Sequence, residues 1–203
     1  MLGGLAAARG ARLVASDLHP HRARRVLDAL RRSDGENYGV VAADGRQVPW
    51  PPGTFDRVLA DVPCSGLGSL RRRPEARWRK TPGDLEELAS LQRELLGTAL
   101  DSVRPGGVVA YVTCSPHLAE TRDVVTAVTQ ARDDVTVLDA PAVLPEVPGL
   151  RSAESGAESG AHSGPGSGPD SRFAQFWPHR HGTDAIFLAL LRRGVSGAAE
   201  GTG

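Results

Sequence analysis

Residues 56–68 read DRVLADVPCSGLG, a short apolar run followed by a loop that carries a carboxylate, a thiol and two glycines. Residues 108–116, VVAYVTCSP, repeat this arrangement with a second apolar run that ends in Thr-Cys-Ser. Short apolar runs bounded by turn residues are typical of buried strands. We therefore expect two strands of one sheet, each of which leads into a cysteine-bearing segment.

The other apolar runs and the helical patterns between them predict an α/β fold. Further strand patterns lie at residues 12–16, 38–43, 135–138 and 185–191. Helical patterns begin at Pro20, at Asp84 and near His117. The second helix is expected to end before Pro105-Gly106-Gly107, with an inward face made of Leu85, Leu88, Leu91, Leu95, Ala99 and Val103. Alternating strands and helices favour a parallel sheet covered on both faces, with a ligand site at the carboxyl ends of the strands.

The composition fits one domain, residues 1–193, and excludes several classes of function. The 203 residues are 40% hydrophobic and 24% charged, which is enough for one ordinary core. Because 24 Lys and Arg residues balance 24 Asp and Glu residues, a strongly basic nucleic-acid binder is excluded, and such binding must come from a local patch. No apolar run reaches the roughly 20 residues that cross a bilayer. We therefore expect no membrane partner. The two cysteines form neither a disulfide framework nor a Cys-x-x-Cys motif, which favours a reducing cytoplasm. The histidines have no neighbouring Cys, Asp or Glu arranged as a ligand set, so we expect no metal.

Two segments are expected to lie outside the core. Residues 151–172 are rich in Ser, Gly and Pro and have no large apolar side chain, which predicts a flexible insertion within the domain. Residues 194–203 are similar in composition and predict a disordered tail.

Four predicted strand ends carry polar or reactive side chains. They are Asp17, Asp44, the segment 61–64 and Cys114. A carboxylate at a strand end can accept hydrogen bonds from two ribose hydroxyls, which suits Asp17, and Asp44 could accept one from an adenine amine. A single Asp in such a place is more often a helix cap or a turn former. Four such ends at one edge of a sheet nevertheless favour a binding site.

The two cysteines are more specific than the aspartates. Cys64 lies three residues after Asp61 on a loop stiffened by Pro and Gly, and Cys114 ends the next strand. A lone cysteine is usually an inert buried side chain, whereas a thiol beside strand ends and turns can be exposed as a thiolate. His117, three residues after Cys114, leaves open a cysteine hydrolase, although no acid is fixed by the sequence to orient the histidine.

Together these motifs resemble the Sun/Fmu-type RNA (cytosine-5) methyltransferases, which modify small-subunit ribosomal RNA. The resemblance covers residues 2 to about 149 and resumes at Phe173. It rests on SDLHPHR, ADG, ADVPCSGLG, RRRPEARWRK, RPGG, VTCSPHLAET and WPHRHGTDAIFLALLRR, in that order. The resemblance implies a Rossmann-like class I methyltransferase sheet, S-adenosylmethionine as methyl donor and ribosomal RNA as partner. We expect the protein to be a monomer.

The resemblance also implies which residues bind the donor. Asp17 would hold its ribose and Asp44 its adenine. Asp61 and Pro63 would lie near the donor and the target base.

Catalysis by resemblance would be covalent. Cys114 would be the nucleophile, because a thiolate added to carbon-6 of cytosine turns the ring into an enamine that can take a methyl group at carbon-5. Asp61 would stabilise the charge that develops on the ring. Cys64 would assist breakdown of the adduct. The DNA cytosine-5 methyltransferases instead attack with the Pro-Cys thiol and need no second cysteine, so the presence of both favours RNA.

A basic run follows the first cysteine loop. Its candidate RNA contacts are Arg71, Arg72, Arg73, Arg77, Trp78, Arg79 and Lys80. Cations of this kind contact phosphates, and an indole ring can stack on a base. A solvated basic loop that pairs with acids of the next helix is the other interpretation.

Two features of the family are absent from the sequence. One is a Gly-rich loop resembling D-x-C-A-A-P-G-G-K, which contacts the methionine part of the donor, and the other is an upstream RNA-binding region. The strand that leads into that loop lies between the strands that end at Asp17 and Asp61, so its absence leaves edge groups unpaired at about 1–3 kcal/mol for each buried group. We therefore expect a catalytic domain that is incomplete at its amino end, and unstable or inactive alone. A non-catalytic RNA-binding or ribosome-assembly factor that retains the fold is the alternative.

Overall fold

The computed structural model describes residues 2–32, 37–150 except Lys80, and 172–195. Most of the expected insertion at 151–172 and of the expected tail at 194–203 lies outside the described residues. The chain forms two compact units, residues 1–51 and 52–203, and each is described by itself. The expectation of one domain over residues 1–193 stays a prediction.

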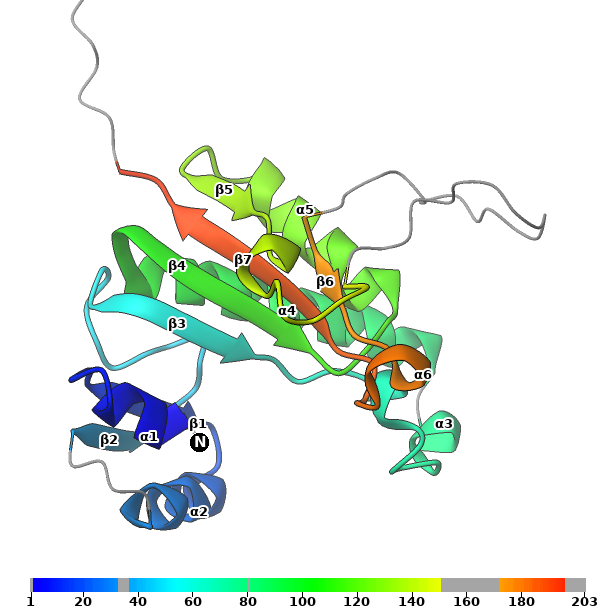
Figure 1. Ribbon diagram of the computed structural model, residues 1–203, viewed down its shortest axis with the longest axis horizontal. Coiled ribbons are helices and arrows are strands. Elements are labelled where there is room, and N and C mark those ends of the chain that lie inside the picture. The colour runs from blue at the N-terminus through cyan, green and yellow to red at the C-terminus, as the bar shows by residue number, and fades with distance from the viewer. Residues whose placement is uncertain (1, 33–36, 80, 151–171, 196–203) are drawn as a thin grey trace, which may run out of the picture. The chain divides into compact units, whose positions relative to one another are not determined.

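The first unit is a two-stranded parallel sheet with two helices (Figure 1). Its elements are α1 (Leu2–Ala7), β1 (Leu13–Asp17), α2 (Pro20–Arg31) and β2 (Tyr38–Ala42). The strands agree with the predicted runs at 12–16 and 38–43, and they pair in register from Leu13↔Tyr38 to Asp17↔Ala42. Helix α2 begins at Pro20 as predicted, because proline has no N–H to lose in a first helical turn, and it buries Ala23 and Leu30.

The second unit holds a mixed five-stranded sheet with helices (Figure 1). Its strands are β3 (Phe55–Asp61), β4 (Val103–Thr113), β5 (Val135–Leu138), β6 (Ala174–Gln175) and β7 (Phe187–Arg193). Its helices are α3 (Ala76–Arg79), α4 (Pro82–Ser102), α5 (Arg122–Gln130) and α6 (Pro178–His181), with short 3-10 turns at Leu67–Ser69, Leu118–Glu120 and Pro141–Val143. The strand order is β3-β4-β7-β5, and β6 pairs with β7.

The prediction of a wholly parallel sheet is wrong for β7. This strand runs antiparallel to both β4 and β5. It enters the sheet with Phe187 opposite Thr113, the last residue of β4, so the chain arrives at the carboxyl end of β4. No helix of the described residues returns the chain to the other end between β6 and β7. Without such a crossover the strand can only pair antiparallel.

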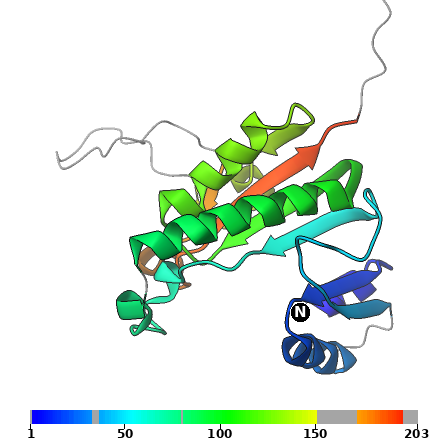
Figure 2. The ribbon, with the colours of Figure 1, turned by 180° about the vertical axis from the view of Figure 1, so that it is seen from behind.

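Helices α4 and α5 lie along one face of this sheet (Figure 2). Thr81 begins α4 with a capping box, in which Thr81 and Asp84 satisfy each other's backbone N–H groups. Of the predicted inward stripe of α4, Ala99 and Val103 are buried and the leucines are half-buried. The other buried positions are Ala89, Gln92, Leu96, Leu100 and Ser102, so the buried face lies partly beside the predicted stripe, which followed the leucines and omitted a buried glutamine.

Strand β7 places apolar side chains on both faces of the sheet. Phe187, Ala189 and Leu191 belong to the core shared with α4 and α5. Leu188 and Leu190 pack on the opposite face against a smaller cluster built around Ala140, Leu150 and Ala174. This strand is therefore buried on both sides, which explains its nearly continuous apolar sequence.

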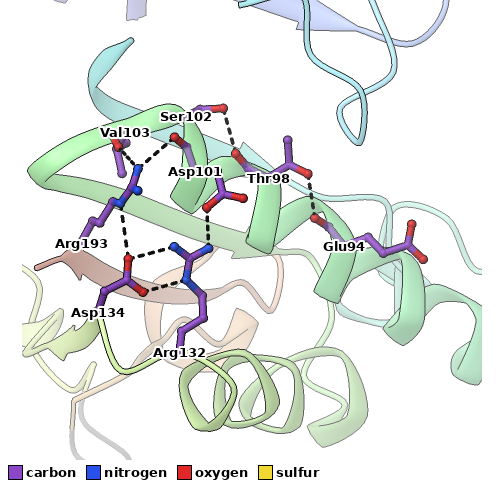
Figure 3. A network of polar contacts seen from close by, with 8 residues as sticks. All are labelled: Glu94, Thr98, Asp101, Ser102, Val103, Arg132, Asp134 and Arg193. Carbon is purple, nitrogen blue, oxygen red and sulfur yellow. Dashed lines mark hydrogen bonds and ion pairs between the residues drawn. The ribbon is translucent and has the colours of Figure 1, made fainter. Parts of the chain in front are cut away.

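Charged side chains form a network of hydrogen bonds and ion pairs at the end of β4 that is remote from Cys114 (Figure 3). Arg132 donates to Asp101 at 2.7 Å and to both oxygens of Asp134 at 2.9 Å. Arg193, at the end of β7, donates to the carbonyls of Asp101 and Val103. The network joins the end of α4 to β7 and to the turn before β5. Arg132 is the first cause of the lowered pKa of Asp134.

The described residues form two separate sheets where the sequence predicted one. Strand β1 pairs with β2, and β3 pairs with β4. Among the described residues no strand pairs with the remaining edge of β3. The gap expected between the strands that end at Asp17 and Asp61 stays a prediction, because the two strands belong to different units.

Candidate active site

The two cysteines meet at the carboxyl ends of β3 and β4. These strands are parallel, with Asp61 opposite Val112, so the segments that follow them leave the sheet at the same edge. The Sγ atoms of Cys64 and Cys114 lie 3.0 Å apart. Both cysteines are free thiols and both are half-buried. The structure brings these two predicted site residues together, and their catalytic roles stay predictions.

Glycine allows the backbones of the two segments to approach this closely. Gly66 has φ +73°, a left-handed conformation that favours glycine. The N–H of Gly68 donates to the carbonyl of Cys114 at 2.9 Å, and its carbonyl accepts from Ala185 N–H at 3.0 Å. A Cβ atom on Gly68 would lie 2.0 Å from the carbonyl oxygen of Ala185 and 2.7 Å from that of Cys114. The absence of a side chain at Gly68 therefore allows three backbone segments, those of Gly68, Cys114 and Ala185, to lie in contact.

The environment gives the two thiols opposite acidities. The pKa of Cys114 is lowered to about 6, first because the Cys64 thiol can donate a hydrogen bond to its thiolate, and further because Ser69 also stabilises it. The pKa of Cys64 is raised, because its proton is engaged by Cys114 and because the thiol is buried. A shared proton thus leaves Cys114 as the thiolate and Cys64 as the donor.

Asp61 faces the same site from the last position of β3. Its charge opposes ionisation of Cys114, which places the carboxylate within electrostatic reach of the thiol. The side chain is accessible, but neighbouring protein atoms remove part of its hydration and raise the pKa of the carboxyl. Pro63, the other residue expected near the donor, accepts a hydrogen bond at its carbonyl from Gln92 Nε2 at 2.8 Å.

A buried carboxylate that the sequence analysis did not single out lies behind the thiols. Glu120 is wholly buried and accepts from the N–H of Ser65 at 2.7 Å and from the hydroxyl of Ser115 at 2.6 Å. The hydroxyl of Ser65 and the side-chain amide of Gln92 also donate to it. Ser65 and Ser115 directly follow the two cysteines. The only sequence signal is its place in VTCSPHLAET, six residues after Cys114.

Arg72 differs from the rest of the basic run because a buried acid holds it. Its guanidinium donates to both carboxylate oxygens of Asp184, which also accepts from Ser69 Oγ at 2.9 Å. Arg72 is the first cause of the lowered pKa of Asp184, about 2. The Cys114 thiolate also raises the pKa of Arg72, so this guanidinium acts on the thiol electrostatically. The expected RNA contact at Arg72 stays a prediction, and the structure gives this residue a link to the site itself.

The remaining basic residues lie on the surface around α3. Arg71, Arg73 and Arg77 are exposed, and Trp78 exposes 83% of its surface. Lys80 and the side chain of Arg79 lie outside the described residues. An indole so accessible has a free face for stacking.

The other two predicted donor contacts belong to the first unit. Asp17 is the last residue of β1 and Asp44 lies two residues after the parallel strand β2, so both lie at the same end of that sheet. Asp17 Oδ1 accepts from the N–H of His19 at 2.8 Å. Asp44 accepts from the N–H of Arg46 and pairs with its guanidinium at 2.7 Å, which lowers its pKa to about 2. Both therefore make the turn contacts that were the simpler interpretation, and their roles toward a ligand stay predictions.

Two searches of the described part of the chain bear on partners. It contains no group of three or more His, Cys, Asp or Glu side chains placed to hold a metal ion. None of its helices combines the length and the apolar character needed to cross a membrane.

Comparison with known proteins gives one family. The family model described as 16S rRNA methyltransferase RsmB/F matches residues 2–192. A putative methyltransferase of Mycobacterium tuberculosis is 49% identical over 196 residues, which cover 95% of this chain and 37% of that protein. A mouse protein named 28S rRNA (cytosine-C(5))-methyltransferase is 32% identical over 185 residues, covering 89% of this chain and 22% of the mouse protein. This chain thus spans well under half the length of these relatives.

Solved structures agree with the sequence relatives. NSun6 from Pyrococcus horikoshii, solved with SFG, superposes with a TM-score of 0.67 and 26% identity. The match covers 92% of this chain and 42% of that structure. A methyltransferase homolog protein from the same organism has a TM-score of 0.68 at 24% identity, which shows the shared fold.

Proposed function

We propose, from the premise that this chain belongs to the 16S rRNA methyltransferase RsmB/F family, that it forms part of a catalytic domain that methylates carbon-5 of a cytosine in ribosomal RNA. Enzymes of this family take the methyl group from S-adenosylmethionine. The observation that carries the proposal is the pair of sulfurs 3.0 Å apart, beside Asp61, with the lower pKa at Cys114.

The thiols divide the chemistry between them. The Cys114 thiolate forms a bond to carbon-6 of the cytosine, and the ring electrons move so that carbon-5 becomes nucleophilic. Carbon-5 then bonds to the methyl carbon of the sulfonium donor, whose sulfur leaves with the electron pair. Loss of the carbon-5 proton to a base and cleavage of the carbon-6–sulfur bond restore the aromatic ring and the thiolate. Cys64, the protonated partner, assists cleavage of the carbon-6–sulfur bond by donating a hydrogen bond to the departing Cys114 thiolate, and is not the base that takes the carbon-5 proton.

Asp61 suits the charge that develops on the ring. Burial raises the pKa of the Asp61 carboxyl, so this group takes up a proton more readily than an exposed aspartate, and once protonated it donates a hydrogen bond to the cytosine ring nitrogen on which charge develops. The opposite assignment, attack by Cys64, is disfavoured because burial and the bond to Cys114 keep that thiol protonated. The geometry therefore supports the RNA-type order of the two cysteines.

Asp17 and Asp44 of the first unit are the proposed contacts for the ribose and the adenine of the donor. Asp17 fits a ribose contact, because the bond from the N–H of His19 engages one carboxylate oxygen, Oδ1. Asp44 fits less well, since Arg46 engages both of its oxygens. The sequence contains no segment of the D-x-C-A-A-P-G-G-K type, so we infer that this chain by itself binds the donor weakly or not at all.

The basic segment around α3 is the proposed RNA contact. Exposed guanidinium groups attract phosphates, and the exposed indole of Trp78 can stack on a base that has left its helix. A looped or single-stranded target lowers the free energy needed to extrude the cytosine.

We place the reaction in a reducing cytoplasm, because two free thiols whose sulfurs lie 3.0 Å apart would otherwise be oxidised to a disulfide. We expect the protein to be a monomer.

The test compares this chain with one extended upstream, each incubated with labelled donor and ribosomal RNA. We expect transfer by the extended chain, none by its Cys114→Ala variant, and a protein–RNA adduct that survives denaturation in its Cys64→Ala variant. Transfer by Cys114→Ala, or free turnover by Cys64→Ala, would contradict the assigned roles. RNA binding without transfer by the extended chain would favour the non-catalytic assembly factor. Tight donor binding by the chain alone, measured by calorimetry, would contradict the requirement for the missing loop.

A further inference from the structure

We propose that Glu120 is a positioning residue for this reaction, because its buried carboxylate holds the serine that follows each cysteine and thereby fixes the two sulfurs beside each other. The inference rests on the proposed function, since it assigns Glu120 to the same pair of thiols. It concerns a residue that touches neither thiol directly.

The hydrogen bonds of Glu120 connect the two cysteine segments. Oε1 accepts from the N–H of Ser65 at 2.7 Å, and Oε2 accepts from the hydroxyls of Ser65 and Ser115. The two hydroxyl oxygens lie 3.3 Å apart. One carboxylate thus fixes position i+1 of both cysteines. Because those residues are wholly or almost wholly buried, water cannot replace the carboxylate without reorganising the segments.

The surroundings of Glu120 hold it in one orientation. Gln92 Nε2 donates to Glu120 Oε1 at 3.2 Å and to the carbonyl of Pro63 at 2.8 Å. The hydroxyl of Tyr111 lies 2.8 Å from the Glu120 carbonyl and 3.3 Å from Gln92 Oε1. Side chains of helix α4 and strand β4 therefore hold Glu120 in place through these hydrogen bonds. This also explains why Gln92, a polar residue, occupies the centre of the buried face of α4.

The hydroxyls of the two serines also accept hydrogen bonds from the backbone of their own segments. The hydroxyl of Ser65 accepts from the N–H of Leu67 at 3.4 Å, and that of Ser115 accepts from the N–H of His117 at 3.2 Å. Each Cys-Ser pair is thus held in a local turn whose hydroxyl is anchored on the same acid. Removing the acid frees both turns at once.

Phenylarsine oxide measures the separation of the sulfurs directly, because trivalent arsenic bridges two thiols only when they lie close together. We expect one arsenic bound per wild-type chain and none after Cys64→Ala. Glu120→Ala should weaken capture by about tenfold to 100-fold, since a displacement of 1 Å can reduce a proximity-dependent step by about that factor. Glu120→Gln should restore most of it, because the amide still offers an acceptor to Ser65 N–H and a donor to the hydroxyls.

Control variants separate positioning from general stability. Ser115→Ala removes one anchor and should weaken capture, whereas Ser102→Ala removes a buried hydroxyl bond to Thr98 at the remote end of the sheet and should not. Should Glu120→Ala fail to fold, Ser65→Ala and Ser115→Ala carry the test. Wild-type capture by the folded Glu120→Ala variant, or by both serine variants, would overturn the inference. Because the assay uses neither donor nor RNA, this result is independent of whether Cys114 proves to be the nucleophile.

Discussion

Removal of the Cys64 sulfur should raise the pKa of the Cys114 thiol. The neighbouring thiol, 3.0 Å away, is the largest cause of the lowered pKa of about 6. In a Cys64→Ala variant the remaining influences oppose one another, since burial and Asp61 raise this pKa and Ser69 lowers it. We therefore expect a pKa near the ordinary thiol value of about 8.5.

The size of the effect depends on which quantity is measured. With a pKa of about 6, about 90% of Cys114 is thiolate at pH 7, and with a pKa of about 8.5 about 3% is, a decrease of about 30-fold. A more basic thiolate is a better nucleophile. With a Brønsted slope of about 0.4–0.5, a pKa that is higher by about 2.5 raises the reactivity of each thiolate by about tenfold or slightly more. The alkylation rate at pH 7 should therefore fall only about threefold or less. The midpoint of the pH–rate profile, in contrast, should move by about 2.5 units.

Alkylation by iodoacetamide between pH 5 and 10, followed by mass spectrometry of the cysteine peptides, reads this midpoint for each thiol. Wild-type Cys114 should react with a midpoint near pH 6, and the variant should overtake the wild-type rate above about pH 7.5. In a Cys114→Ala control, Cys64 should show no wave near pH 6. An unchanged midpoint after Cys64→Ala would refute the view that one thiol activates the other, and a wild-type midpoint near 8.5 would refute the lowered pKa itself.

Three further variants test other parts of the structure. Gly68→Ala forces a Cβ against two backbone carbonyls and should lower the free energy of unfolding by about 3 kcal/mol or more in urea titrations; a change below about 0.5 kcal/mol would contradict the close approach. Arg132→Ala should lower it by about 1–2 kcal/mol at pH 7 through lost bonds to Asp101 and Asp134. That difference should shrink as the pH falls below the ordinary aspartate pKa of about 3.9, because acid then protonates the carboxylate of lowered pKa, while the alkylation midpoint of Cys114 stays unchanged. Trp78→Ala should weaken RNA binding by about 1–3 kcal/mol in fluorescence anisotropy with no change in its salt dependence, because the indole carries no charge.

Local sequence pattern was sufficient to place the strands and the thiols. The run at residues 135–138 is a strand with those bounds, and those before Cys64 and Cys114 lie in the sheet as expected. Two apolar runs that end in cysteines could be paired correctly because adjacent parallel strands bring their carboxyl ends to one edge. The bounds of α4 were also close, since Thr81, Pro82 and Asp84 form a recognisable helix start.

Strand direction and the buried face of α4 could not be obtained in this way. The direction of β7 depends on where the segment before it meets the sheet, and residues 173–186 carry no pattern that reports this location. In α4 the buried face follows what the helix packs against, so Gln92 lies inside because Pro63 and Glu120 need its amide. A pattern of leucines cannot reveal a partner that lies about 30 residues away.

Glu120 shows why buried polar residues are the hardest part of a site to predict. Along the chain it resembles an ordinary surface acid, since it lies two residues before Arg122, the first residue of α5, and acids are common near helix N-termini. Its burial is favourable only because Ser65 and Ser115 arrive from two different strands, and a buried carboxylate is stable only when such donors surround it. In the sequence, this need for hydrogen-bond donors is visible only as a serine directly after each cysteine. Two Cys-Ser pairs at the ends of parallel strands therefore predict a buried acid that accepts hydrogen bonds from both serines, although the pairs do not show which residue it is. The structure identifies this acid as Glu120.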